Sequence, residues 1–203
     1  MEVLKRWFIA LSIGVVLSAC GGGDGSSVDS SSAYVPAEKI QDNIFSNITG
    51  VNYPYDIYLF LTQELIPIVE AEYDIDPNER TLAGHSFGGA KTAYIMLTED
   101  IGVEFFKNFI ISDGSFWRID DTIYSLEEQR YEASPWLEAT AILSSTNIGN
   151  HPSVDAFYKH IQSKGYMGFN LPPLIEYKKL DHGKMWYHTY RDSLPILFPK
   201  EEI

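Results

Sequence analysis

Cysteine is almost absent from this sequence, since Cys20 is the only one among 203 residues. A lone cysteine excludes a disulfide within the chain, even in an oxidising compartment. Patterns of metal ligands are lacking too, because the histidines and carboxylates show no His-x-x-x-His or comparable spacing. We therefore expect neither a metal ion nor an organic cofactor.

Basic residues are also scarce. Lys and Arg number 15 against 28 Asp and Glu, which gives a formal net charge of -13. No cluster of Lys and Arg interrupts this acidity after residue 6. Binding to phosphate backbones depends on such clusters. The composition therefore argues against nucleic acid as a partner and predicts a soluble, self-repelling surface.

The apolar run at the N-terminus, residues 7–17, is too short to cross a bilayer as a helix. It follows Lys5 and Arg6, and a basic start before a short apolar stretch is typical of a secretion signal. We interpret this segment as a targeting element that takes no part in the folded domain.

The run ends in the letters LSACG at residues 17–21, which resemble the bacterial lipobox, in which the cysteine is diacylated and becomes the mature N-terminus. We therefore expect a signal peptide at 1–19 and a lipidated Cys20. Residues 20–34, rich in Gly, Ser and Asp, then form a flexible tether. This interpretation places the protein in the bacterial cell envelope, anchored to a membrane on the periplasmic or outer-membrane side. The alternative is an ordinary signal peptide with an accidental cysteine.

Residues 35–203 are enough for one domain with a sizeable core. Short apolar stretches that suit buried strands alternate with segments of helical periodicity. This alternation predicts an α/β fold, a three-layer α/β/α sandwich with a mostly parallel sheet. The expected strands lie at 81–83, 105–112, 140–145 and 174–179, and the expected helices at 57–73, 88–97, 121–138 and 153–164.

The motif G-x-S-x-G occurs at residues 84–88, between an apolar strand end and a helix that opens with two glycines. A serine on a tight strand-to-helix turn has a strained backbone, and small neighbours leave room around it. The turn also directs the next N–H, that of Phe87, toward an oxyanion at the positive end of the helix dipole. We therefore predict Ser86 as a nucleophile. Without this context the motif is a glycine-rich turn with an incidental serine.

A serine nucleophile needs a base, and five histidines are available. His85 lies within the motif, where we expect its side chain to point away from the site. His182 follows the fourth expected strand and precedes an aromatic helix, which is the late position that the catalytic histidine of α/β-hydrolases takes. It is our candidate general base, ahead of the remaining histidines at positions 151, 160 and 188.

Segment 60–99, which includes the letters RTLAGHSFGG, resembles an esterase family of α/β-hydrolases that includes the siderophore trilactone esterases and esterase D. The resemblance continues through FFKNFIISDGSFW at 105–117 and DHGKMWYHTYRDSLPILF at 181–198, and covers about residues 55–198. It implies a trimmed α/β-hydrolase fold and hydrolysis of carboxylic esters, with a small-molecule, siderophore or glycan ester as substrate.

The triad acid is less evident, because the residues after the third expected strand hold no carboxylate before Asp155. We nominate Asp155 and leave open a Ser-His dyad without an acid. The sequence Asp113-Gly114-Ser115 stands where the family has Ser-Pro-Ser. We expect this departure to alter the floor of the substrate site.

Only a short segment precedes the helix expected at 57–73, whereas family members have several antiparallel strands and a loop that supplies the second oxyanion N–H. Residues 35–55 either replace this region in brief or leave the oxyanion hole incomplete. The rival hypothesis is therefore a lipid-anchored degenerate hydrolase that binds a ligand without turnover. A structural envelope lipoprotein is a third option, but it leaves the serine motif unexplained.

Overall fold

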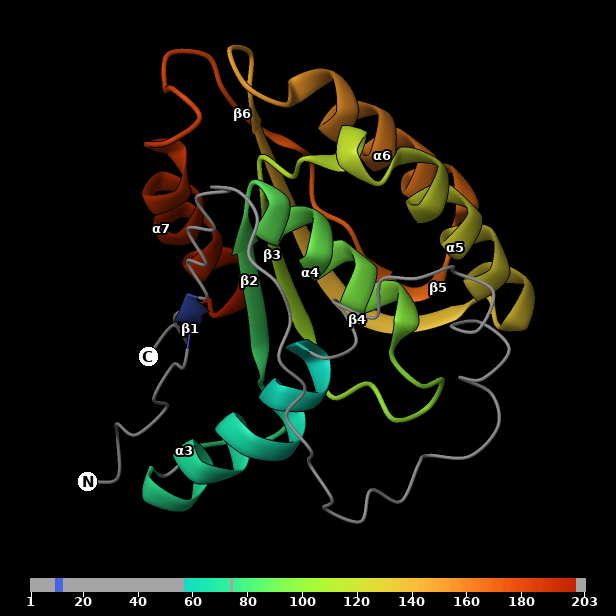
Figure 1. The fold of residues 1–203 in the computed structure, drawn as a ribbon, viewed down its shortest axis with the longest axis vertical. Helices are drawn as coiled ribbons and strands as arrows, with labels where there is room; N and C mark the ends of the chain where they lie inside the picture. The colour runs from blue at the N-terminus through green and yellow to red at the C-terminus, as the bar shows by residue number, and fades with distance from the viewer. Residues whose placement is uncertain (1–9, 13–56, 74, 200–203) are drawn as a thin grey trace, which may run out of the picture.

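A computed structural model describes residues 10–12, 57–73 and 75–199 (Figure 1). Its sheet has six strands, in the order β1-β2-β3-β4-β5, with β6 paired to the other half of β4. Every pairing is parallel. The strands are β1 (Ala10–Ser12), β2 (Thr81–His85), β3 (Asn108–Ser112), β4 (Trp136–Thr146), β5 (Met167–Asn170) and β6 (Ile175–Tyr177).

Helices cover both faces of the sheet, as expected for three layers. Helix α4 packs on β2 and β3, α6 packs on β4, and α5 lies between α4 and α6. Helix α7 contacts β3 and β4 from the opposite side (Figure 1). The bounds are α3 (Ile66–Glu72), α4 (Phe87–Thr98), α5 (Asp120–Ala133), α6 (His151–Lys164) and α7 (Met185–Leu197), with shorter turns η1 (Phe60–Leu65) and η2 (Phe116–Arg118).

The main core lies between the sheet and the layer of α4, α5 and α6. Its largest fully buried side chains include Phe109, Phe116 and Phe157, and the rings of Phe116 and Phe157 stack with centroids 4.2 Å apart. Strand β3 is buried along its whole length. A strand covered on both faces is apolar throughout, which explains the uninterrupted letters FII within it.

The helix expected at 57–73 changes type along its length. A π-helical turn, η1, precedes α3, and Pro67 occupies the first turn of α3. A proline lacks an N–H and its ring crowds the carbonyl one turn back. The wider π turn before it accommodates that loss, so the chain continues with a change of helix type instead of a break.

Three strands differ most from the sequence prediction, one in where it begins and two because they were not expected at all. Strand β4 starts at Trp136, inside the segment expected as helix, because α5 already ends at Ala133. Strand β5 was not predicted, since its four residues are mostly exposed and lack an apolar pattern. Strand β1, within the run interpreted as a secretion signal, pairs with the free side of β2. The pairing satisfies backbone groups that an edge strand leaves open.

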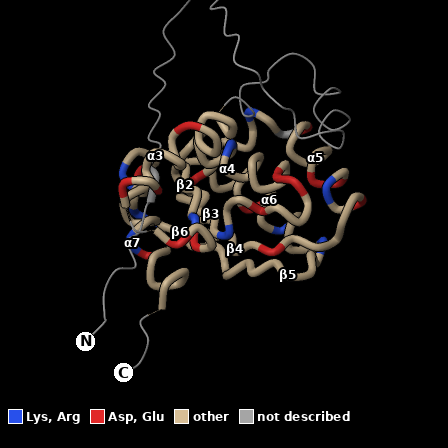
Figure 2. Tube along the Cα trace, turned by 90° about the horizontal axis from the view of Figure 1, so that it is seen from below, with Lys and Arg blue, Asp and Glu red and all other residues tan. Residues whose placement is uncertain are grey.

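The lipidation candidate Cys20, the tether and the whole front segment 35–55 lie outside the described residues. Across the described ranges, none of the helices combines the length and apolarity needed to cross a membrane. Lys and Arg are scattered among Asp and Glu over these elements (Figure 2).

Candidate active site

The serine motif forms the expected sharp turn between β2 and α4. Ser86 has φ 59° and ψ -122°, and its N–H donates to the carbonyl of Ser112 on the neighbouring strand at 2.9 Å. A Cβ on Gly84 would lie 2.3 Å from the carbonyl oxygen of Gly88. The glycine therefore allows α4 to pack directly on β2, and the turn presents the Ser86 side chain at the carboxyl end of the sheet.

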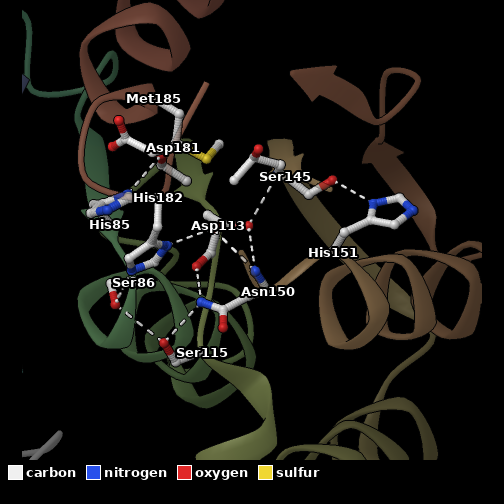
Figure 3. Close-up of polar contacts among 12 residues, drawn as sticks. His85, Ser86, Asp113, Ser115, Ser145, Asn150, His151, Asp181, His182 and Met185 are labelled. Atoms are coloured by element: carbon white, nitrogen blue, oxygen red, sulfur yellow. Dashed lines mark hydrogen bonds and ion pairs between the residues drawn. The ribbon is translucent and has the colours of Figure 1, made fainter. Parts of the chain in front are cut away.

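His182 faces this serine, as the sequence predicts. Its Nε2 lies 2.9 Å from Ser86 Oγ, and its Nδ1 lies 2.5 Å from Oδ2 of Asp113 (Figure 3). An ionised carboxylate only accepts hydrogen bonds, so the imidazole proton is on Nδ1. Nε2 is then the acceptor for the Ser86 hydroxyl. The three side chains have the connectivity of a nucleophile, a base and an acid.

The acid nominated from the sequence is wrong in position. Asp155 is on the surface of α6, where its Oδ2 lies 2.7 Å from Lys159 Nζ. This contact is an i,i+4 pair within one helix, whereas the carboxylate at His182 Nδ1 belongs to Asp113. Asp113, directly after β3, occupies the place of the acid instead, so the loop we expected to alter the substrate floor carries the carboxylate.

The Asp113 carboxylate is fully buried and well supplied with donors. The N–H groups of Thr146 and Asn150 both donate to it at 3.2 Å. A Cβ on Gly149 would lie only 2.2 Å from Asp113 Oδ2, so this position has room for glycine alone. The loop after β4 thus supplies no carboxylate of its own but holds the one that follows β3.

His85 does not point away from the site, contrary to our expectation. Its ring centroid lies 4.6 Å from that of His182, and its Nδ1 lies 3.1 Å from Ser112 Oγ. Burial, and then the proximity of His182, lower the pKa of His85 below its usual value. A neutral His85 adds no second positive charge when His182 takes up a proton.

A chain of buried hydroxyls attaches α7 to the sheet below His182. Thr189 Oγ1, on α7, lies 3.1 Å from Ser112 Oγ and 2.7 Å from Ser144 Oγ. The Thr189 hydroxyl therefore joins the ends of β3 and β4. Nearer the base, the hydroxyl of Thr146 donates to the carbonyl of Leu180, two residues before His182. These bonds fix the loop that carries His182 relative to the strands that precede Ser86 and Asp113.

Phe87 is the first residue of α4, so its N–H is among those without a partner inside the helix. It follows Ser86 directly, so this N–H stays our predicted oxyanion donor. Two cations lie near its ring, Lys91 Nζ at 4.6 Å and the Arg118 guanidinium at 5.4 Å from the centroid. Burial lowers the pKa of Lys91 to about 8.

The other three histidines are occupied elsewhere. His151 Nδ1 lies 2.8 Å from Ser145 Oγ at the start of α6, and His160 Nε2 lies 2.6 Å from the buried carboxylate of Glu127. His188 lies on α7 beside Tyr177, with ring centroids 6.1 Å apart. In the part of the chain that the structure describes, no three His, Cys, Asp or Glu side chains gather as metal ligands would.

A comparison with protein families matches residues 16–150 to the family described as "Putative esterase". The match extends over more than half of the sequence and includes the Ser86 turn and Asp113. The chain belongs to this family. The match begins before the resemblance read from the sequence, which started near residue 55, and it ends before His182. No curated protein matches the sequence.

Several solved structures share the fold. The BES protein of Bacillus cereus is 19% identical, with a TM-score of 0.61 over 70% of this chain and 55% of that one. An IroE-like serine hydrolase of Shewanella oneidensis is 20% identical, with a TM-score of 0.60 over 70% and 46%. The siderophore hydrolase EstA of Aspergillus nidulans is 16% identical, with a TM-score of 0.59 over 70% and 56%. The chain therefore spans about half the length of the structures it matches.

Sequence reasoning missed Asp113 although a signal was present. Asp113 follows a fully apolar strand and precedes Gly114, and carboxyl ends of neighbouring parallel strands meet at one edge of a sheet. The prediction considered only carboxylates after the next strand. The absence of a carboxylate there, at residues 147–150, was the second indication that the acid had another origin.

Proposed function

We propose that this protein is a serine hydrolase that cleaves carboxylic esters through an acyl-enzyme. The observation that carries the proposal is the continuous contact from Ser86 Oγ through His182 to Asp113, at 2.9 Å and 2.5 Å. Membership of the esterase family supports the reaction class. The strained backbone of Ser86 adds to this support, because such strain is typical of nucleophile turns.

In the acylation step, Ser86 Oγ attacks the ester carbonyl carbon while its proton moves to His182 Nε2. Negative charge develops on the carbonyl oxygen, and the Phe87 N–H at the positive end of α4 stabilises it. The bond from carbon to the alcohol oxygen then breaks, and His182 returns the proton to the leaving alcohol. Asp113 keeps the imidazole oriented and stabilises its positive charge.

In the deacylation step, water takes the place of the alcohol. His182 removes a proton from the water, whose oxygen attacks the acyl carbon, and the proton then passes to Ser86 Oγ as the acid product leaves. Each turnover consumes one water and restores the free serine. His85 remains neutral beside the imidazolium at neutral pH, so it does not oppose the charge that His182 acquires.

The substrate we propose is a small-molecule ester, with siderophore and glycan esters as the first classes to examine. The siderophore class is suggested by solved structures of the same fold that are described as siderophore hydrolases. Those proteins are at most distantly similar in sequence, so the acyl and alcohol groups have to be found by assay. A panel of short-chain aryl esters, siderophore lactones and acetylated glycans covers these classes.

A fluorophosphonate probe gives the decisive experiment, because it labels an activated serine and ignores a serine in a passive pocket. We expect covalent labelling of wild-type protein at Ser86, located by peptide mass spectrometry, and none in Ser86→Ala. Hydrolysis of the ester panel should disappear in the same variant. An unlabelled wild-type protein that hydrolyses nothing on the panel would reject the proposal and favour a binding protein without turnover.

We also propose that Cys20 carries the lipid that attaches the protein to a membrane of the cell envelope. The lipobox-like segment after a basic and apolar start is the support for this. Two or three acyl chains give stable attachment, whereas one chain anchors only marginally. Cys20→Ser should therefore move the protein from the membrane fraction to the soluble fraction, and unchanged sedimentation would refute the anchor.

A further inference from the structure

The side-chain amide of Asn150 contacts three groups around the site, and Figure 3 shows those on Asp113 and Ser115. The chemistry of two of the three groups fixes the orientation of the amide. The indole Nε1 of Trp117 lies 2.9 Å from Asn150 Oδ1, and the backbone oxygen of Asp113 lies 2.7 Å from Nδ2. An indole N–H only donates and a carbonyl only accepts. The reversed amide would therefore place donor against donor and acceptor against acceptor.

This orientation determines the role of the Ser115 hydroxyl. Nδ2 of Asn150 also lies 3.1 Å from Ser115 Oγ, so Ser115 accepts a hydrogen bond from the amide. The single proton of Ser115 is then available to Ser86 Oγ, which lies 3.2 Å away. Ser86 in turn has its own proton for His182 Nε2. The direction of every hydrogen bond in this series is thus set by the Trp117 indole at one end and the Asp113 carboxylate at the other.

The contacts close into a ring, because the backbone N–H of Asn150 donates to the carboxylate of Asp113. Ser115 is held firmly within this ring, being 4% exposed and donating its backbone N–H to the carbonyl oxygen of Ser86 at 2.9 Å. Hydrogen bonds that run in one direction polarise one another. A donor at Ser86 Oγ also prevents the Ser86 proton from turning away from the base.

We propose that Ser115 and Asn150 are positioning residues for the nucleophile. Asn150 orients the Ser115 hydroxyl, and Ser115 donates to Ser86 Oγ so that the Ser86 proton points to His182. This inference rests on the proposed function, since it assigns how the Ser86 hydroxyl is prepared for attack. Trp117, at the start of the hydrogen-bond sequence, sets the direction by securing the Asn150 amide.

The test measures the rate of Ser86 labelling by a fluorophosphonate, together with kcat and KM for an aryl ester, in the full chain. Ser115→Ala and Asn150→Ala should each lower the labelling rate and kcat about five- to tenfold, the effect of one lost hydrogen bond, with KM unchanged. The double variant should lose no more than Asn150→Ala alone, because both residues act through one contact. Asn147→Ala, exposed in the same loop, is the matched control and should behave as wild type.

Trp117→Phe is the second variant, chosen because the side chain is 59% exposed and its loss does not threaten the fold. It keeps an aromatic ring but removes the N–H that holds the Asn150 amide. We expect labelling to be about two- to threefold slower, because the variant weakens the contact between Ser115 and Ser86 without removing it. Labelling at the wild-type rate in all three single variants, or losses that multiply in the double variant, would overturn the inference. Failure of the wild-type protein to label would instead reject the proposed function itself.

Discussion

Two residues of the site, Ser86 and Asp113, have positive φ angles of 59° and 43°. Neither is glycine, and a positive φ costs an ordinary residue on the order of 1 kcal/mol or more. Both directly follow buried parallel strands, and both turn their side chains toward His182. The surrounding packing compensates this strain, and as a result Ser86 and Asp113 reach one imidazole from neighbouring strands.

Replacing each of the two candidate acids by asparagine, in separate variants, distinguishes their roles. Asp113→Asn should lower kcat about a thousandfold or more, because an amide at this position donates to Nδ1 and moves the imidazole proton to Nε2, where it blocks the base. Asp155→Asn should stay within about twofold of wild type, since its partner is the exposed Lys159. Steady-state assays with an aryl ester check both. A large loss in Asp155→Asn alone would restore the acid predicted from the sequence.

At the scale of elements, the loop between β4 and α6 holds the acid that follows β3. It supplies the N–H groups of Thr146 and Asn150 to Asp113, and it passes so close that only a glycine fits at position 149. The hydroxyl of Thr146 also anchors the segment before His182. One short loop thus sets the distance between the acid and the base.

Gly149→Ala tests this close approach. The added Cβ would lie 2.2 Å from Asp113 Oδ2 and 2.7 Å from Thr146 Cγ2, so the carboxylate has to move. We expect kcat to fall about a hundredfold, the cost of an ångström-scale misplacement, and the free energy of unfolding to drop by about 1 to 3 kcal/mol.

The matched control is Gly183→Ala, whose new Cβ would meet nothing nearer than Asp181 Oδ1 at 3.5 Å. It places the same methyl group beside the base instead of the acid, and activity should remain near that of wild type. Equal losses in both variants, measured by ester hydrolysis and chemical denaturation, would show that the Gly149 contact has no special role.

For the whole molecule, stability should depend on pH through Glu99, a buried carboxyl at the end of α4. Burial is the main cause that raises its pKa from 4.5 to about 8, and the N–H of Phe106, which donates to it at 3.2 Å, opposes this only in part. The folded protein therefore binds a proton that the unfolded chain releases above pH 4.5. The contribution of Glu99 to the free energy of unfolding is therefore fully present below pH 4.5, and it is lost as the pH rises through about 8.

Glu99→Gln should remove most of this dependence, because the amide stays neutral and its oxygen still accepts from Phe106. The wild-type free energy of unfolding should fall by at most about 1.4 kcal/mol per pH unit between pH 5 and 8, and the variant should show a flatter profile. Urea denaturation at several pH values measures both. Glu128→Gln, at an exposed position of α5, is the control, and a slope as steep in Glu99→Gln as in wild type would contradict the assignment.

The sequence by itself determined the parts of this protein that depend on neighbours along the chain. Five consecutive residues specify the turn at Ser86, and a single glycine, Gly165 with φ 66°, specifies the end of α6. Local periodicity specifies the alternation of strands and helices. The late position of His182 added the base, because the order of elements places it at the same edge of the sheet.

Only the tertiary structure decided which carboxylate meets that base. The parallel register sets His85 opposite Ser112 and Ser112 opposite Ser144, so the residues that follow these three emerge side by side. Whether Asp113 then turns inward depends on its positive φ and on donors from residues 146–150, more than thirty positions away. The sequence marked Asp113 as a carboxylate at the end of a strand, but it held neither this φ angle nor these distant donors, and for this reason local rules predicted Ser86 and His182 together but paired them with Asp155.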